Sequence, residues 1–430
     1  MDGAGPTPAE RIRVLLLLPS LHGGGAERVA VHILNHADRS AFDVRMGLLR
    51  RFGPYLSDID PALVDASPIG ERHLDFDRGN AEAYRAGSLA LGVALTPVNV
   101  IAMIRKFRPH VVVSFRKGMS VITWGALLLR GRRGVRWIAR EGNNTLAVIE
   151  DELASPLARA AVRRLTARCY GSADVLLTIS HEMADGIARD LGLPRERMRT
   201  VHNAVDIAEV RRRAAEPAPV PEGPPYLVAV GRLERQKGFD VLLDAFAASG
   251  ARETHRLIIL GEGSDGEDLR ARVTALGLDG RVLMPGWDDN PWAWMKGADA
   301  FVLSSRWEGF GNVVIEAMAC GLPVVVTDCD FGPKEIVRHG ESGLVVPTGE
   351  VGPLREAIDR VVSDRALHDR LASAAARRAE DFDVAVSVRR YEEVFREVAF
   401  DLTGLAPAAT ERRPKSRSVD APSSSPESGR

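Results

Sequence analysis

Two glutamates frame a glycine-containing segment in the second half of the chain, Glu308-Gly309-Phe310-Gly311-Asn312-Val313-Val314-Ile315-Glu316. The apolar run AFVLSS before this segment is typical of a buried strand, and a helix is predicted to start near Asn312. The free N–H groups and the dipole of that helix start would face an anion. Glu316, about one turn into the helix, could then accept hydrogen bonds from two ribose hydroxyls, while Glu308 reaches another polyol. Helix capping is the alternative, but it needs only one carboxylate.

Two cations follow the apolar run that opens the second half, Arg232 after Gly231 and Lys237 before Gly238. An arginine can hold phosphate oxygens through two parallel hydrogen bonds, and a lysine adds a compact second charge. Two such residues at the carboxyl end of a strand predict an anion site that needs no metal. Two solvated surface charges are the alternative interpretation.

Three consecutive glycines, Gly23, Gly24 and Gly25, follow the first strand-like run and precede a helical stretch. Backbone N–H groups in such a turn, together with the positive end of the helix, suit a phosphate or a sugar hydroxyl. A plain tight turn is the alternative. The segment is not GxGxxG, and no acidic residue can be identified as a ribose anchor about 20 positions later. A nicotinamide-dependent oxidoreductase is therefore disfavoured.

No metal site or disulfide framework is expected. Cys169, Cys320 and Cys329 are far apart and show no zinc-ligand spacing, which favours buried thiols in a reducing compartment. Asp328-Cys329-Asp330 has the spacing of an acidic metal-binding pair, but we interpret it as an ordinary loop after a strand.

Apolar runs alternate with helical stretches along most of the chain. In the first half, strand-like runs lie at 12–19, 44–49, 110–115, 135–140, 174–180 and 198–206, with helical stretches such as 97–108 and 157–170 between them. The same alternation continues over 226–347. Continuous β-branched runs are typical of strands buried on both faces of a parallel sheet. The pattern predicts an α/β protein with two Rossmann-like, doubly wound domains whose ligands bind beyond the carboxyl ends of the strands.

Composition sets the domain boundaries. We predict a first domain at 1–208 and a linker at 209–225, whose proline, alanine and charged residues should not continue a packed element. The second domain follows at 226–384, and a last helix at 385–402. Residues 403–430 are rich in serine, proline and arginine and are predicted to be a disordered tail.

Charge is unevenly distributed in this chain of 430 residues with a net charge of −1. Residues 105–168 contain fourteen Lys or Arg and four Asp or Glu, including the stretch LLLRGRRGVRW. This surface could meet an anionic membrane or a phosphorylated acceptor, or it could be a solvated basic face. Nucleic acid is disfavoured because the basic residues are not interleaved with aromatic ones. No early apolar stretch is long enough to span a bilayer, so a cytoplasmic protein, peripheral on the inner face of the plasma membrane, is expected.

Several stretches carry a resemblance to a known family: GGGAE (23–27), HNAVD (202–206), GRLERQKGFD (231–240), LGEG (260–263), EGFGNVVIEAMACGLPVV (308–325) and GESGLVVPTG (340–349). From Ile12 to about Leu402 the chain resembles glycosyltransferase family 4, whose members are retaining enzymes. The resemblance implies the GT-B fold, in which two Rossmann-like domains face a cleft and the C-terminal helix crosses back to the first.

The resemblance also implies roles for individual residues. Arg232 and Lys237 would neutralise the diphosphate leaving group, and Glu308 would contact the donor sugar. The remaining donor-binding residues would be Gly24, Gly25, Phe310, Gly311, Asn312, Val313 and Glu316. Members of the family use no metal and no cofactor, and their donor, a nucleotide sugar, is a substrate. Retention is usually ascribed to attack on the same face of the sugar, with the departing phosphate taking the acceptor's proton.

The acceptor side departs from the commonest family pattern. Many relatives carry a histidine after the strand that corresponds to VRWIAR, whereas Arg140, Glu141 and Asn143 occupy that place here. This resembles relatives that build bacterial surface polysaccharides and lipid-linked oligosaccharides, as does the stretch GPKEI at 332–336. The resemblance therefore implies transfer of a hexose or N-acetylhexosamine, with UDP as the expected nucleotide, to a glycan or lipid-linked acceptor. A synthase acting on a small soluble acceptor and a catalytically inactive nucleotide-sugar-binding homologue are the alternatives.

Overall fold

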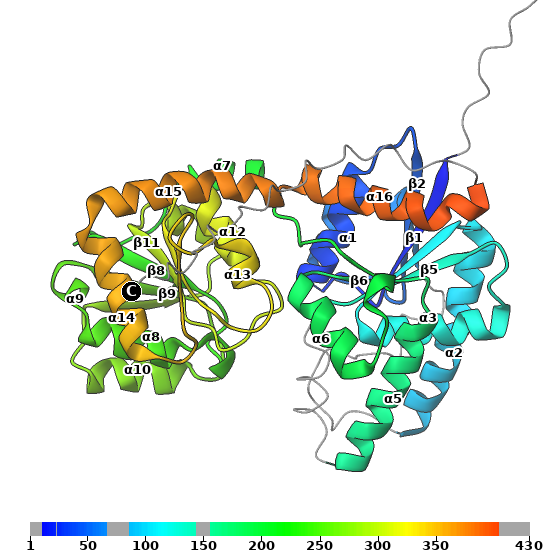
Figure 1. The fold of residues 1–430 in the computed structure, drawn as a ribbon, viewed down its shortest axis with the longest axis horizontal. Helices are drawn as coiled ribbons and strands as arrows, with labels where there is room; N and C mark the ends of the chain where they lie inside the picture. Colours follow the sequence, from blue (N-terminus) through cyan, green and yellow to red (C-terminus); the bar gives the residue numbers. More distant parts are fainter. Residues whose placement is uncertain (1–10, 23, 67–85, 143–154, 404–430) are drawn as a thin grey trace, which may run out of the picture.

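The computed structural model describes residues 11–22, 24–66, 86–142 and 155–403. These residues form two α/β domains that lie side by side (Figure 1). Each domain contains one sheet, and all neighbouring strands within the described parts of both sheets pair in parallel. The prediction of two Rossmann-like domains in a GT-B arrangement is thereby confirmed.

The first domain is built on a seven-stranded sheet with the order β3-β2-β1-β4-β5-β6-β7. Its strands are β1 (Ile12–Leu18), β2 (Phe42–Leu48), β3 (Val64–Ala66), β4 (Val111–Phe115), β5 (Arg136–Arg140), β6 (Val175–Thr178) and β7 (Met198–Thr200). The connecting helices include α1 (Gly25–His36), α2 (Ala86–Phe107), α3 (Lys117–Arg130), α5 (Pro156–Ser172) and α6 (His181–Leu191). The strand order reverses between β1 and β4, and ligands of open sheets bind at such a reversal.

The second domain has a six-stranded sheet with the order β10-β9-β8-β11-β12-β13. Its strands are β8 (Tyr226–Val230), β9 (Arg256–Leu260), β10 (Val282–Gly286), β11 (Ala300–Leu303), β12 (Val324–Thr327) and β13 (Leu344–Val346). Its helices are α8 (Phe239–Ala248), α9 (Ala251–Thr254), α10 (Gly266–Ala275), α11 (Pro291–Lys296), α12 (Asn312–Ala319), α13 (Pro333–Ile336), α14 (Val351–Ser363) and α15 (Arg365–Ala379). Here the order reverses between β8 and β11, the two strands that precede Arg232 and Glu308.

The segment predicted to be a linker is partly helical. Helix α7 (Ile207–Ala214) occupies its first part, is capped by the side chain of Asp206, and packs against α11 and α12 of the second domain. Its buried residues, Ile207, Val210 and Ala214, recur at helical spacing and supply the apolar face that the compositional argument overlooked. The strand predicted at 198–206 is shorter than expected, because β7 ends at Thr200.

The chain crosses back at its end, as the GT-B resemblance implied. Helix α16 (Val384–Thr403) follows α15 and packs on α1, β1 and β4 of the first domain (Figure 1). Its buried side chains, among them Tyr391 and Phe395, join the core of that domain. The predicted tail beyond Thr403 lies outside the described residues. Among the helices that the structure does describe, none is both long enough and apolar enough to cross a bilayer.

Candidate functional site

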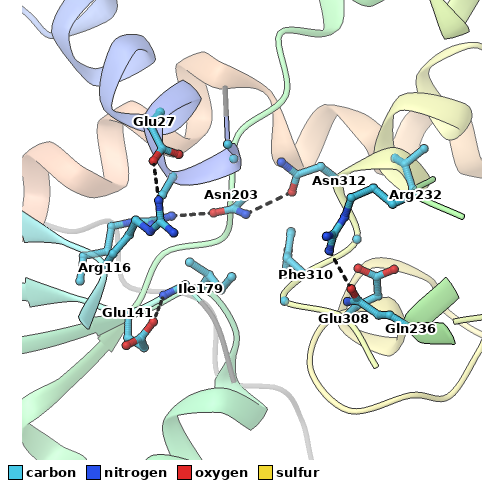
Figure 2. Close-up of a pocket in the computed structure, with 18 of the residues that line it drawn as sticks. Glu27, Arg116, Glu141, Ile179, Asn203, Arg232, Gln236, Glu308, Phe310 and Asn312 are labelled. Carbon is cyan, nitrogen blue, oxygen red and sulfur yellow. Dashed lines mark hydrogen bonds and ion pairs between the residues drawn. The ribbon is translucent and has the colours of Figure 1, made fainter. Parts of the chain in front are cut away.

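A cavity of about 390 Å³ lies between the carboxyl ends of the two sheets and is lined by both domains (Figure 2). The first domain contributes Gly24, Gly25, Ala26, Glu27, Arg116, Arg140, Glu141, Gly142, Ile179 and Asn203. The second contributes Arg232, Gln236, Lys237, Glu308, Gly309, Phe310, Gly311, Asn312 and Val313. All the predicted site residues that the structure describes line this cavity, with the exception of Glu316.

The start of α12 forms part of the second-domain wall. Gly311 precedes the helix with φ +93° and ψ +46°, a left-handed conformation that a residue with a side chain adopts only at a cost. This turn brings Asn312 and Val313, the first two residues of α12, to the cavity, and the N–H groups of a helix start have no partner within the helix. Phe310 beside them is buried and stacks on His202 of the first domain, with ring centroids 5.2 Å apart.

The predicted cations on this wall differ in their surroundings. The Nζ of Lys237 donates to Oε1 of Glu308 at 2.6 Å, and both side chains are largely buried. The hydroxyl of Ser305 donates to the same oxygen at 2.7 Å. Arg232 is more exposed and donates to Glu234 and Gln236 at 2.8 and 3.1 Å. Lys237 and Glu308 are therefore fixed in place, while Arg232 lies in the more open part of the wall.

Glu316 lies one turn into α12, beyond the cavity lining. Its Oε2 accepts a hydrogen bond from the indole N–H of Trp292 at 3.0 Å. Its Oε1 lies 3.6 Å from a guanidinium nitrogen of Arg28, which belongs to α1 of the first domain. Burial lowers the pKa of Arg28, but the negative charge of Glu316 and the contact with Tyr55 outweigh burial, so the pKa of the guanidinium is raised above its ordinary value. The carboxylate is thus close to the cleft and shared between the two domains.

The glycine turn of the first domain lies opposite α12. A Cβ added to Gly24 would come within 2.4 Å of a carboxylate oxygen of Glu27, so a side chain there would displace this buried glutamate. A Cβ on Gly25 would lie 3.8 Å from the side-chain nitrogen of Asn312. The turn is therefore placed where it can approach a ligand held by the second domain.

Two of the three residues predicted for the acceptor side lie at the cavity. Arg140 and Glu141 both line the cavity at the end of β5, and both are almost completely buried. Glu141 accepts hydrogen bonds from the Gly142 N–H at 2.9 Å and from the hydroxyl of Tyr170. Asn143 lies outside the described residues.

Arg140 has a structural role as well. It donates to the Tyr391 hydroxyl of α16 and to the Asn203 side chain, each at 2.7 Å. Its guanidinium also lies over the ring of Phe115, 5.1 Å from the centroid. The hydrogen bond from Arg140 to Tyr391 therefore helps to hold α16 against the first domain.

Asn203 and Arg116 are among the lining residues that sequence reasoning missed. Asn203 accepts from Arg140 and donates to the Asn312 side chain at 3.2 Å, so it links the two domains (Figure 2). Arg116, directly after β4, bonds to Glu27 at 3.2 Å. In the sequence, Asn203 is marked only by the HNAVD stretch, and Arg116 only by its place after the run HVVVSF. The sequence alone does not identify the residue with which either one interacts.

A second contact between the domains surrounds Glu335 of α13. Its carboxylate accepts from the backbone N–H groups of His181 and Glu182 at 3.0 and 2.9 Å, and bonds Nε2 of His202 at 2.9 Å. Burial raises the pKa of Glu335, but the hydrogen bonds from His202 and His181 lower it by more, giving a net lowered pKa.

Within the described part of the chain, one group of side chains has the spacing of a metal site, namely His181, His202 and Glu335, whose ligand atoms lie within 4.8 Å of one another. Since the carboxylate already caps α6 and bonds His202, we interpret this group as an interdomain contact. The three cysteines are buried, and burial raises each thiol pKa to about 12, in agreement with structural thiols.

Comparison with known proteins gives the same assignment for both domains. Residues 210–378 match the family described as "Glycosyl transferases group 1", and residues 24–204 match the "Glycosyl transferase 4-like domain". The lipopolysaccharide core biosynthesis glycosyltransferase LpsE of Rhizobium meliloti is 29% identical over 349 residues, which are 81% of this chain and 88% of that protein. The lipopolysaccharide 1,6-galactosyltransferase of Salmonella typhimurium is 32% identical over 204 residues, 46% of this chain and 55% of that protein.

Solved structures share the fold over most of the chain. The apo form of the lipopolysaccharide outer core galactosyltransferase WaaB superposes with a TM-score of 0.69 at 21% identity, covering 90% of this chain and 100% of that one. Anabaena HepE in complex with UDP and glucose gives a TM-score of 0.68 at 21% identity, with the same coverage. The chain belongs to the group 1 glycosyltransferases of the GT-B fold and is a glycosyltransferase.

Proposed function

We propose that this enzyme transfers a hexose or N-acetylhexosamine from a UDP-linked donor, with retention and without a metal, to a glycan or lipid-linked acceptor in bacterial surface polysaccharide or glycolipid biosynthesis. The observation that carries the proposal is the composition of the second-domain wall. Lys237, Arg232 and the first residues of α12 line one cavity beside the buried carboxylate of Glu308.

This wall suits the departure of a nucleoside diphosphate. Negative charge develops on the leaving phosphate as the glycosidic bond breaks, and fixed cations and helix N–H groups stabilise it with little reorganisation. Lys237 is held by its bond to Glu308 and therefore points at a defined place before the donor arrives. In this proposal Glu308 binds hydroxyls of the donor sugar, and the departing phosphate accepts the proton of the attacking hydroxyl.

Glu316 is proposed to bind the ribose. Ribose hydroxyls would replace the long contact of 3.6 Å between Glu316 and Arg28, while the Trp292 N–H continues to orient the carboxylate. The relatives support the nucleotide and the pathway proposed, because HepE is described in complex with UDP and two relatives are named for lipopolysaccharide synthesis.

Peripheral membrane binding is proposed for the end of α3. Leu128 and Leu129 are 66% and 73% exposed and lie directly before Arg130, Arg132 and Arg133. Exposed apolar side chains beside arginines fit a surface that has an acyl layer under anionic headgroups. This segment corresponds to the most basic part of the stretch 105–168.

The test of the proposed function is calorimetric titration with UDP, GDP and ADP, followed by donor turnover with mass-spectrometric detection of the transferred sugar. We expect micromolar affinity for UDP, about ten-fold or more above that for the other two, and slow hydrolysis of one UDP-sugar without acceptor. Absence of any nucleotide binding would contradict the proposal. Nucleotide binding without hydrolysis or transfer for any donor would favour the inactive homologue, and turnover with a small soluble acceptor would favour the synthase.

A further inference from the structure

Arg116 has a backbone conformation that side chains rarely adopt. It lies between β4 and α3 with φ +72° and ψ +150°, close to a region that is essentially restricted to glycine. The surrounding hydrogen bonds hold it there, because its N–H donates to the Arg140 carbonyl at 3.2 Å and its own carbonyl accepts from the Ser120 N–H at 3.0 Å. Backbone strain of this kind is concentrated at functional sites, where it sets the position of a side chain. The group positioned here is the guanidinium of Arg116.

The guanidinium of Arg116 lies on the first-domain wall of the cavity. The side chain is 41% exposed, and one nitrogen bonds the buried carboxylate of Glu27 at 3.2 Å (Figure 2). The start of α3 follows directly, and the helix adds positive potential at this point. The strained backbone of Arg116 thus holds a cation that is partly open to the cavity.

Arg140, on the adjacent strand end, supplies an independent observation. Its guanidinium is almost completely buried, yet its partners among the described residues are the neutral side chains of Tyr391, Asn203 and Phe115. Its Nη1 has no hydrogen-bond partner there, and it lies 3.1 Å from the position that a Cβ on Gly142 would take. A buried charge without a counter-ion is costly.

Among the described residues, neither carboxylate on this wall forms an ion pair with Arg140. Glu27 is bonded by Arg116, and Glu141 is bonded by the Gly142 N–H and the Tyr170 hydroxyl. The first-domain wall therefore presents two arginines to the same cavity, and one of them, Arg140, is buried without an ion-pair partner among the described residues. The cations of the second-domain wall are separate from both.

We propose that Arg116 and the Nη1 of Arg140 form an anion subsite that binds a phosphate group of the acceptor. The inference rests on the proposed function, in which the donor diphosphate is bound by the opposite wall. A phosphate or diphosphate ester fits because a guanidinium matches its oxygens through paired hydrogen bonds. Acceptors that carry a phosphate near the attacked hydroxyl are then preferred over neutral glycans of the same size.

The subsite can be tested by titrating inorganic phosphate into enzyme that is saturated with UDP. The substitutions are made at Arg116, because substitution of Arg140 would also remove its contact with α16. Arg116→Ala should weaken phosphate binding about ten-fold or more, and Arg116→Lys should retain part of it. Affinity for UDP should not change in either variant. Arg189→Ala removes the same charge from an exposed position on α6 of the same domain and serves as the control, with phosphate binding like that of the wild type.

The variant Arg116→Gly separates the effect of backbone strain on stability from the effect of the lost charge on phosphate binding. It should lose phosphate binding as Arg116→Ala does, but melt about 2–4 °C higher than Arg116→Ala, because glycine accepts the positive φ. Equal phosphate binding by wild type and Arg116→Ala, or none by either, overturns the subsite. A loss of UDP affinity in Arg116→Ala instead assigns the arginine to the donor and also overturns it. A wild-type protein that binds no nucleotide contradicts the proposed function itself.

Discussion

The ammonium group of Lys237 lies 2.6 Å from a carboxylate oxygen of Glu308, although 71 residues separate the two in sequence. They follow the neighbouring strands β8 and β11, whose carboxyl ends meet at one edge of the sheet. The pair is largely buried, with side-chain exposures of 13% and 7%. Removing one partner from such a pair leaves the other charge uncompensated.

Substitution of the cations should weaken nucleotide binding. Charge-assisted hydrogen bonds to phosphate contribute about 1.5–3 kcal/mol each, so Arg232→Ala and Lys237→Ala should each reduce UDP affinity about ten-fold or more. Lys237→Ala should have the larger effect, because it also leaves Glu308 as an uncompensated negative charge facing the diphosphate. Calorimetric titration with UDP measures both, with the exposed Arg270→Ala as control. Unchanged affinity in both variants would remove these residues from the donor site.

The two glutamates should fail in different ways. Glu316→Ala should weaken binding of bare UDP, because UDP still contains the ribose, and should raise the donor KM. The kcat can also fall, because binding energy from remote parts of the donor supports the chemical step. Glu308→Gln should lower kcat with little change in affinity for bare UDP, which lacks the sugar. Titration with UDP, combined with steady-state kinetics on the donor, separates them. Loss of UDP binding in Glu308→Gln alone would mean that the roles are reversed.

Turnover should not require a divalent metal. The cations and helix N–H groups of the second-domain wall are proposed to stabilise the leaving group themselves. Donor turnover measured after incubation with EDTA should equal that of untreated enzyme. A complete loss that manganese restores would contradict this prediction.

Membrane binding should depend on the exposed end of α3. Vesicles that contain phosphatidylglycerol should bind the wild type, and binding should fall as salt rises, since screening acts over about 8–10 Å at physiological ionic strength. The double variant Leu128→Ser, Leu129→Ser should bind weakly in a sedimentation assay, whereas Leu165→Ser, an exposed position on α5, should bind normally. Equal binding to neutral and anionic vesicles would leave a solvated basic face as the explanation.

Acid should weaken the contact between the domains at Glu335. Its pKa is lowered, so the ionised carboxylate contributes stability that is fully present above the ordinary value of 4.5 and is lost as pH falls through the lowered pKa. The melting temperature of the wild type should therefore exceed that of Glu335→Gln at neutral pH, and the difference should shrink below about pH 4.5. Glu341→Gln, at an exposed position, is the control. A difference that stays constant from pH 7 to 3.5 would show that ionisation of Glu335 plays no part.

The sequence by itself determined the two sheets and most of the second-domain wall. Buried β-branched runs define parallel strands, and functional groups that follow such strands collect at one edge of the sheet. Arg232, Lys237 and Glu308 were predictable for this reason. The glycine turn was predictable too, because its position after the first strand is a local feature.

The tertiary structure alone decided which residues of the two domains meet. Asn203 reaches Asn312 over 109 positions, and Arg140 reaches Tyr391 over 251, because α16 returns to the first domain and the domains dock across the cleft. No local periodicity encodes such contacts, since they depend on strand order and domain orientation. The same holds for the positive φ of Arg116, whose N–H bonds the Arg140 carbonyl on the neighbouring strand although the residue's own backbone preference is against this conformation.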